Sequence, residues 1–184
     1  KPTETGWGVD RTASQFAALM SLLGYERYVA QGGDWGAGIT TAVGALDAGH
    51  CAAIHITLAM GARPNLDGDL SPEAKHSLER LQFYRDWDSG YSKQQATRPQ
   101  TLGYGLVDSP AGQAAWILEK FWAWVDHDGH PEDVLDRPEL IDNVMLYWIN
   151  GNAASSGRLY WESFGKGTRH TVAIPTGFAV FPKE

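Results

Sequence analysis

A single acidic residue stands inside a glycine-rich turn, in the segment Gly32-Gly33-Asp34-Trp35-Gly36. The order small–x–acid–x–small is the form of a nucleophile elbow, with Asp34 at the position where many hydrolases carry a serine. Apolar residues precede the turn and helix-forming residues follow it, which predicts a strand over residues 28–31 and a helix over residues 37–48. The turn therefore has the strand–turn–helix setting that an exposed nucleophile needs.

The glycines around Asp34 indicate a tight turn. Side chains at Gly32 and Gly36 are expected to collide with the neighbouring strand or with the start of the helix. The turn places the carboxylate at a helix N-terminus, where the partial positive charge stabilises it. Such a carboxylate needs no base for activation and suits attack on a saturated carbon that carries a leaving group, as in an epoxide or an alkyl halide. The alternative is that Asp34 is an ordinary acidic helix cap.

The composition narrows the class of protein. The 184 residues carry a formal net charge of −7, which argues against an electrostatic surface for nucleic acid. Cys51 is the only cysteine, which excludes an intrachain disulfide and a thiolate metal cluster, and we interpret it as a small buried apolar residue. The sequence shows no apolar run long enough to span a membrane and no secretory signal, so we expect a cytoplasmic protein. The 8 tryptophans and 7 tyrosines are typical of an apolar ligand cavity.

The chain is expected to contain three parts. Residues 1–66 alternate helices and short apolar strands, which is typical of part of an α/β core. Residues 67–168 show only helical patterns and are interpreted as a lid. Residues 169–184 return to the core with strand character and lead to the acidic residue Glu184. The predicted fold class is therefore α/β, a parallel sheet with a large helical lid inserted.

Start and stop signals bound the predicted helices. Thr12 or Ser14 is expected to cap the first helix and Gly24 to end it. The apolar residues at helical spacing in this helix are Phe16, Leu19, Met20 and Leu23. Start signals for later helices occur at Ser71-Pro72, at Ser109-Pro110 and at the capping box Asp136-x-x-Glu139.

Strand patterns occur at residues 28–31, at residues 52–58 and at residues 171–181, the last of them interrupted by Pro175 and Gly177. These are few strands for a parallel sheet, whose usual size is about five to six strands. We therefore interpret the chain as a fragment of a larger domain.

Further motifs follow the elbow in a fixed order. They are Gly90-Tyr91, Ala96 to Thr101, Asp108-Ser109-Pro110, Glu119-Lys120-Phe121, Asn143 to Trp148, Ser155-Ser156, Arg158-Leu159-Tyr160 and Val172 to Glu184. With these motifs the chain resembles epoxide hydrolases of the α/β-hydrolase fold, of the microsomal type and its bacterial and fungal relatives. The resemblance covers essentially the whole chain. The lid motifs are more specific than the elbow, which haloalkane dehalogenases share.

The resemblance implies hydrolysis of an epoxide to a vicinal diol in two steps. Asp34 attacks an epoxide carbon and forms an alkyl–enzyme ester, while Tyr91 and Tyr160 hold the epoxide oxygen and protonate it. The backbone N–H of Trp35 forms half of the oxyanion hole when water attacks the ester. Glu184 orients the histidine that activates this water.

Tyrosine suits the proton-donor role on chemical grounds. Ring opening produces an alkoxide, whose conjugate acid is far weaker than a phenol with a pKa of about 10. A tyrosine therefore stays protonated beforehand and donates as the carbon–oxygen bond breaks. Without the flanking motifs, packing is the favoured interpretation of Tyr91 and Tyr160, and the residues interpreted as lid packing are Tyr84, Tyr104 and Tyr147.

The resemblance also implies groups that this chain does not carry. None of the 6 histidines corresponds to the catalytic histidine, which the resemblance places after Glu184, and the other half of the oxyanion hole is placed before Lys1. We therefore expect this fragment to form the ester but not to turn over. The His127-x-x-His130 pair is interpreted as part of a solvated loop, because its spacing fits no zinc signature. Neither a metal nor a cofactor is expected.

The expected partners are a small apolar epoxide and water, with no nucleic acid and no indication of membrane association, and a homodimer is one option. Two alternatives stay open. A haloalkane or haloacid dehalogenase would use the same aspartate, but with halide-binding groups in place of the tyrosine pair. A truncated remnant without catalysis would only bind apolar ligands.

Overall fold

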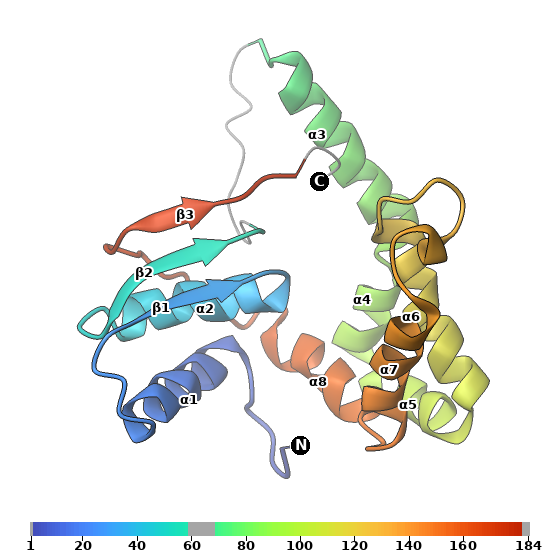
Figure 1. Cartoon of the computed structure of the whole chain (residues 1–184), viewed down its shortest axis with the longest axis horizontal. Coiled ribbons are helices and arrows are strands. Elements are labelled where there is room, and N and C mark those ends of the chain that lie inside the picture. The colour runs from blue at the N-terminus through green and yellow to red at the C-terminus, as the bar shows by residue number, and fades with distance from the viewer. Residues whose placement is uncertain (1, 59–68, 182–184) are drawn as a thin grey trace. The chain divides into compact units, whose positions relative to one another are not determined.

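The computed structural model describes residues 2–58 and 69–181, and the chain forms two compact units (Figure 1). The sheet unit comprises Glu4–Gly90 and Ser163–Glu184, and the helical unit comprises Lys1–Thr3 and Tyr91–Glu162. The elements of the sheet unit are α1 (Val9–Leu22), β1 (Tyr28–Gly32), α2 (Trp35–Leu46), β2 (Cys51–Ile56), α3 (Pro72–Phe83), the π-helical turn η1 (Tyr84–Asp88) and β3 (Thr176–Phe178). Among the described residues, no helix combines the length and the apolar composition needed to cross a bilayer.

The three strands form a parallel sheet in the order β1-β2-β3, which confirms the predicted sheet. Gly32 at the end of β1 is in register with Ile56 of β2, and Ile56 is in register with Phe178 of β3. The strand predicted over residues 171–181 is much shorter than expected. Pro175 has no N–H to donate to the ladder, and β3 begins only after it.

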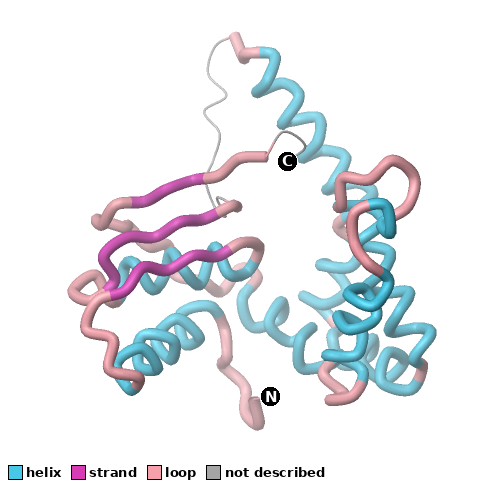
Figure 2. The backbone as a smooth tube through the Cα atoms, in the orientation of Figure 1, coloured by secondary structure: helices cyan, strands magenta, loops and turns pink. Residues whose placement is uncertain are grey.

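The core of the sheet unit lies on the face that the first two helices cover. Helix α1 packs against α2, and α2 packs against β1 and β2 (Figure 2). The buried residues of this core are Ala13, Ala42, Val43, Cys51 and Ile54. Cys51 is 0% exposed and is a free thiol, as predicted, and burial raises its pKa. The thiol is therefore a packing group.

Helix α1 begins earlier than predicted, with Gly8 as its N-cap residue. The predicted caps at Thr12 and Ser14 are wrong, because both residues lie inside the helix. Each hydroxyl instead donates to the backbone carbonyl oxygen four residues earlier, as Thr12 Oγ1 does to Gly8 at 2.9 Å. The predicted end is confirmed, since Gly24 follows the helix with φ +82°.

The inward face of α1 also differs from the prediction. Val9 and Ala13, one turn apart, contribute to the core. Three of the apolar residues expected there remain between 44% and 60% exposed, namely Phe16, Leu19 and Leu23, and Met20 is half-buried. Val9 and Ala13 are thus the residues of α1 that pack into the core, and the larger apolar side chains stay mostly outside it.

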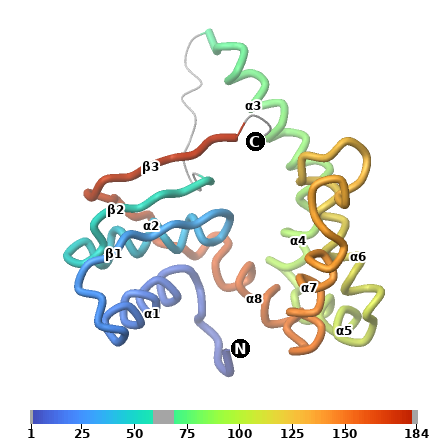
Figure 3. The backbone as a smooth tube through the Cα atoms, in the orientation of Figure 1, coloured from blue at the N-terminus to red at the C-terminus, as the bar shows by residue number. Residues whose placement is uncertain are grey.

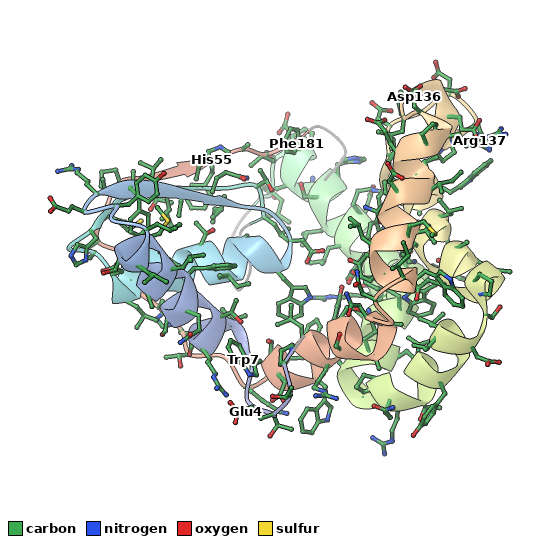
Figure 4. All side chains as sticks on the ribbon, turned by 60° about the horizontal axis from the view of Figure 1, so that its bottom comes forward. Glu4, Trp7, His55, Asp136, Arg137 and Phe181 are labelled. Atoms are coloured by element: carbon green, nitrogen blue, oxygen red, sulfur yellow. The ribbon has the colours of Figure 1, made fainter. Side chains whose placement is uncertain are left out.

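The helical unit contains the later helices predicted for the lid, and Figure 3 traces their order. The helix predicted to start at Ser71-Pro72 is α3, which belongs to the sheet unit. They are α4 (Gly90–Thr97), α5 (Pro99–Asp108), α6 (Pro110–Trp124), the 3₁₀ turn η2 (Pro131–Asp133), α7 (Arg137–Trp148) and α8 (Ala153–Ser163). Ser109 Oγ accepts a hydrogen bond from the Gly112 N–H at 3.0 Å, which confirms the predicted cap of α6. At the start of α7, Glu139 accepts from the Asp136 N–H at 3.0 Å, as the capping box predicts (Figure 4). The role of residues 67–168 as a lid stays a prediction.

The turn between β1 and α2 brings two backbone segments into close contact. A Cβ atom on Gly32 would lie 2.1 Å from the carbonyl oxygen of Gly36, and one on Gly33 would lie 2.6 Å from Thr57 Oγ1. The prediction for Gly32 is confirmed. The prediction for Gly36 is wrong, because a Cβ atom there would meet no described atom within 4 Å. Gly36 contributes its carbonyl group to the contact, and a side chain at Gly33 would displace the Thr57 hydroxyl.

Replacing Gly32 by alanine tests this contact. Gly32→Ala is expected to lower the free energy of unfolding by about 2–4 kcal/mol, because a backbone carbonyl cannot swing away as a side chain can. Gly36→Ala is the matched control and is expected to change it by no more than about 1 kcal/mol, in the stabilising direction, since alanine favours helices. Urea denaturation measures both values. Equal effects of the two substitutions would contradict the steric explanation.

A hydrogen bond joins the beginning of the sheet unit to its end. His170 Nε2 lies 2.7 Å from Asp10 Oδ1, which links the first turn of α1 to the segment after α8. Hydrogen bonds from His170 and then Thr168 lower the pKa of Asp10, and they outweigh the opposing effect of partial burial. The folded chain therefore holds the Asp10 carboxylate in its charged form more strongly than the unfolded chain does.

This pKa shift predicts a dependence of stability on acid. The contribution of Asp10 is complete above the ordinary aspartate pKa of about 4, and it is lost as the pH falls through the lower folded-state pKa. Asp10→Asn is therefore expected to lower stability at neutral pH and to flatten the fall of the unfolding free energy below about pH 4. Denaturation curves recorded across this range provide the measurement. Glu79→Gln, which removes an exposed carboxylate on α3, should leave the slope unchanged; an unchanged slope in Asp10→Asn would contradict the linkage.

Candidate active site

Asp34 adopts a strained backbone conformation between β1 and α2. Its φ is +45° and its ψ is −128°, and within residues 2–58 and 69–181 it is the only non-glycine residue with a positive φ. A positive φ is unfavourable for a residue with a side chain, and such strain is concentrated at functional sites. The strand–turn–helix setting expected for the carboxylate is therefore present, because β1 ends at Gly32 and α2 begins at Trp35.

The Asp34 side chain is exposed, and it does not cap α2. Asp34 is the N-cap residue, yet its carboxylate makes no capping hydrogen bond. The first backbone N–H groups of the helix add partial positive charge beside it. This geometry argues against an ordinary helix cap and leaves the carboxylate oxygens open to a substrate.

Trp35 follows the nucleophile as the first residue of α2. Its backbone N–H belongs to the first turn, where N–H groups point out of the helix N-terminus. Its indole ring packs edge-to-face on Phe164, with ring centroids 5.1 Å apart. The ring is thus held by packing within the sheet unit, and the oxyanion-hole role of its N–H stays a prediction.

Tyr91 of α4 and Tyr160 of α8 meet, although they are far apart in the sequence. Their ring centroids lie 5.9 Å apart with an interplanar angle of 80°. Tyr91 also contacts Trp124 of α6, with ring centroids 5.2 Å apart. Both tyrosines are half-buried. The packing of three helices therefore brings together the two phenols that the resemblance pairs, while their chemical roles stay a prediction.

A cavity of about 340 Å³ lies beside the tyrosine pair within the helical unit. The aromatic residues of its wall are Tyr91, Trp116, Phe121, Trp124, Tyr147 and Tyr160. Gln113 and Asn143 are among its polar groups. This wall agrees with the cavity expected from the many aromatic residues. Two tyrosines differ from their interpretation as packing residues, because Tyr147 lines the cavity and Tyr104 is 70% exposed.

Lys120 is a member of this site that sequence reasoning missed. Its Nζ lies 4.9 Å from the ring centroid of Tyr91 and 5.3 Å from that of Trp124. The same atom lies 2.6 Å from Glu119 Oε1, and the lysine side chain is only 14% exposed. The available signal was the aromatic stripe of α6, in which Lys120 stands four residues after Trp116 and four before Trp124.

The remaining candidates are placed as follows. Asp34 lies in the sheet unit, and both tyrosines lie in the helical unit. Glu184 lies outside the described residues, so its role stays a prediction. His127 and His130 each accept a backbone N–H hydrogen bond at Nδ1, which uses these nitrogens inside their own loop.

Proteins with similar sequences are named as epoxide hydrolases. A protein of Stigmatella aurantiaca named "Putative epoxide hydrolase" is 48% identical over 100% of this chain. Epoxide hydrolase 1 of Oryctolagus cuniculus is 34% identical over 99% of it. The chain spans less than half of these relatives, 42% and 46% of their lengths. No family model matches the chain.

Solved structures with the same fold carry the same name. The juvenile hormone epoxide hydrolase of Bombyx mori has a TM-score of 0.83 and 32% identity, over 97% of this chain and 48% of its own. The epoxide hydrolase of Aspergillus niger has a TM-score of 0.84 and 28% identity, over 100% of this chain and 47% of its own. These relatives give no support to the dehalogenase alternative. By sequence and by fold, the chain is similar to epoxide hydrolases of the α/β-hydrolase fold.

Proposed function

We propose that this chain carries the nucleophile and the oxygen-holding tyrosines of an enzyme that adds water to an epoxide and releases a vicinal diol. The observation that carries the proposal is the strained Asp34 at the end of β1, whose exposed carboxylate makes no capping hydrogen bond. The tyrosine pair beside an aromatic cavity supports it, as do the relatives named as epoxide hydrolases.

In the first step, a carboxylate oxygen of Asp34 attacks one epoxide carbon from the side opposite its carbon–oxygen bond. That bond breaks and its electron pair passes to the epoxide oxygen, which takes a proton from Tyr91 or Tyr160. The products are a 2-hydroxyalkyl ester of Asp34 and a tyrosinate. The exposed position of the carboxylate supports this step, because its oxygens are open to a substrate.

In the second step, water adds to the carbonyl carbon of the ester. A base takes one proton from the water, and the negative charge that develops on the carbonyl oxygen faces the N–H of Trp35. The ester bond then breaks and the Asp34 carboxylate returns. The two protons of the water restore the tyrosine and complete the second hydroxyl group of the diol. By resemblance to the family, we assign the base as a histidine oriented by Glu184.

A small apolar epoxide is the substrate class that the cavity supports. Its volume of about 340 Å³ falls within the usual range for small-molecule sites, and its wall is mostly apolar, with aromatic and aliphatic residues and a few polar groups. Attack by a carboxylate and proton transfer from a phenol account for both bond changes, so the scheme uses neither a metal nor a cofactor. The homodimer and the cytoplasmic location stay predictions.

Reaction with styrene oxide, a small aromatic epoxide, tests the nucleophile and the tyrosines in the whole gene product and in this chain. We expect the diol from the whole protein, and from both proteins a covalent adduct on the peptide that contains Asp34, detected by mass spectrometry. Asp34→Ala is expected to abolish the adduct. The double variant Tyr91→Phe/Tyr160→Phe is expected to slow adduct formation by about 10²–10⁴-fold, which is the usual contribution of a positioned proton donor.

The control for the double variant is Tyr104→Phe, which changes an exposed tyrosine and should leave the rate unchanged. An adduct that persists in Asp34→Ala would refute the nucleophile, and an unaffected double variant would refute the tyrosine roles. Halide release from a haloalkane without diol formation from the epoxide would favour the dehalogenase alternative. Binding of the epoxide without any reaction in the whole protein would favour the remnant.

The strain at Asp34 generates a separate prediction. Its φ of +45° and ψ of −128° mirror an ordinary extended conformation, which glycine adopts without steric cost. Asp34→Gly is therefore expected to have a free energy of unfolding about 1 kcal/mol higher than Asp34→Ala, although neither variant can form the ester. Urea denaturation compares the two. An alanine variant as stable as the glycine variant would show that the folded turn stores no strain at this position.

A further inference from the structure

We propose that Lys120 is a positioning residue for Tyr91, whose phenol it prepares to give a proton to the opening epoxide. This rests on the proposed function and adds a residue that the two-step scheme does not use. Lys120 acts through the Tyr91 ring, because its ammonium group favours the negative charge that Tyr91 acquires when the proton leaves.

The ammonium group lies against two aromatic rings at the cavity wall. Nζ of Lys120 lies 4.9 Å from the ring centroid of Tyr91 and 5.3 Å from that of Trp124, and these rings are 5.2 Å apart. Lys120 and Trp124 stand one turn apart on α6, whereas Tyr91 comes from α4. All three residues line the cavity. Helix packing therefore holds the charge beside the tyrosine.

The burial of Lys120 strengthens its field at the ring. Its side chain is 14% exposed, so the ammonium group has lost much of its hydration. The ring faces and the Glu119 carboxylate, whose Oε1 lies 2.6 Å away, replace part of that hydration. Glu119 is 63% exposed, and water screens its charge more than it screens the buried ammonium group. The ammonium charge therefore lies against the Tyr91 ring, while the carboxylate of Glu119 is exposed to water.

This field favours the ionised tyrosine more than the neutral one. Neutral Tyr91 offers the ammonium group the quadrupole of its ring. A tyrosinate spreads a full negative charge over its oxygen and ring, and the attraction of opposite charges then acts across the 4.9 Å contact. An interaction that grows as the proton leaves lowers the barrier to epoxide opening.

The same geometry assigns different parts to the two tyrosines. Lys120 lies over the ring of Tyr91, and Tyr160 meets Tyr91 edge-on with centroids 5.9 Å apart. Tyr91 is therefore the proton donor, and Tyr160 contributes a hydrogen bond to the epoxide oxygen. Tyr91→Phe is expected to slow ester formation more than Tyr160→Phe does, and the reverse order would overturn this assignment.

The main experiment measures the rate of ester formation at Asp34 in the whole gene product, with styrene oxide in excess. Lys120→Met is expected to slow the reaction roughly tenfold. Lys120→Arg keeps the charge and is expected to stay within about threefold of the parent protein. Glu119→Gln removes the opposing charge and should raise the rate. A rate that falls in Glu119→Gln as far as in Lys120→Met would overturn the electrostatic argument.

A double-mutant cycle with Tyr91→Phe separates this role from simple support of the helices. In the Tyr91→Phe background, Lys120→Met is expected to have no further effect on the rate. A lysine that only stabilises the packing would slow both backgrounds equally, and that result would overturn the proposal. Thermal denaturation monitors folding, and Lys120→Gln replaces Lys120→Met if the methionine variant is unfolded.

A second readout needs no epoxide. Ultraviolet difference spectra during alkaline titration report tyrosinate formation, and subtraction of the Tyr91→Phe spectra isolates the step that belongs to Tyr91. This step is expected at lower pH in the parent protein than in Lys120→Met. If the parent forms no ester but shows this difference, the proposed function fails and the electrostatic contact stands. If the Tyr91 step occurs at the same pH in the parent protein and in Lys120→Met, the proposal for Lys120 fails, whether or not the protein forms the ester.

Discussion

The close approach of Gly32 to the carbonyl group of Gly36 is the constraint on which the rest of the sheet unit depends. Because Gly32 carries no side chain, β1 can end directly beneath the first turn of α2. The residues that join them have little room, and Asp34 takes a positive φ as a result. The position of the carboxylate and the strain in its backbone are therefore two results of one steric fact. Cys51 of β2, Ala13 of α1 and Ala42 of α2 form the core that holds this helix against the sheet.

The helical unit holds the phenols of Tyr91 and Tyr160 and the ammonium group of Lys120 at the wall of an apolar cavity. Local sequence does not place these groups, since α4, α6 and α8 each contribute one or more of them. Edge-to-face contacts between aromatic rings fix the positions of these groups, because Tyr91 contacts both Tyr160 and Trp124. A flexible lysine in this setting is ordered by the rings that it touches. The same packing therefore provides the shape of the cavity and its electrostatic character.

Local signals predicted the structure well, and contacts between distant segments account for the differences. The caps at Ser109 and Asp136 depend on neighbouring residues, so the sequence pattern was enough to find them. The prediction failed at the start of α1, where Gly8 is the N-cap residue, and at the length of β3, which begins only after Pro175. The steric role of Gly36 was misjudged because the crowded atom is its carbonyl oxygen. Helical periodicity does not assign a role to Lys120, which is a charged residue between Trp116 and Trp124 of α6. The packing of α6 against α4 places it beside Tyr91 at the cavity. The tyrosine pair came from the family resemblance rather than from the residues themselves.

The pairing of β2 with β3 bears on the order in which the protein is built. Ile54 and Thr176 are partners in the sheet, and between them the chain passes through every helix from α3 to α8. The bond between Asp10 and His170 closes a still longer loop. Contacts of this kind form late, because the entropy of the loop is lost before the contact contributes. A chain emerging from the ribosome therefore exposes β1, the elbow and β2 well before β3 is available. The helices between them can fold while β2 still lacks its partner β3.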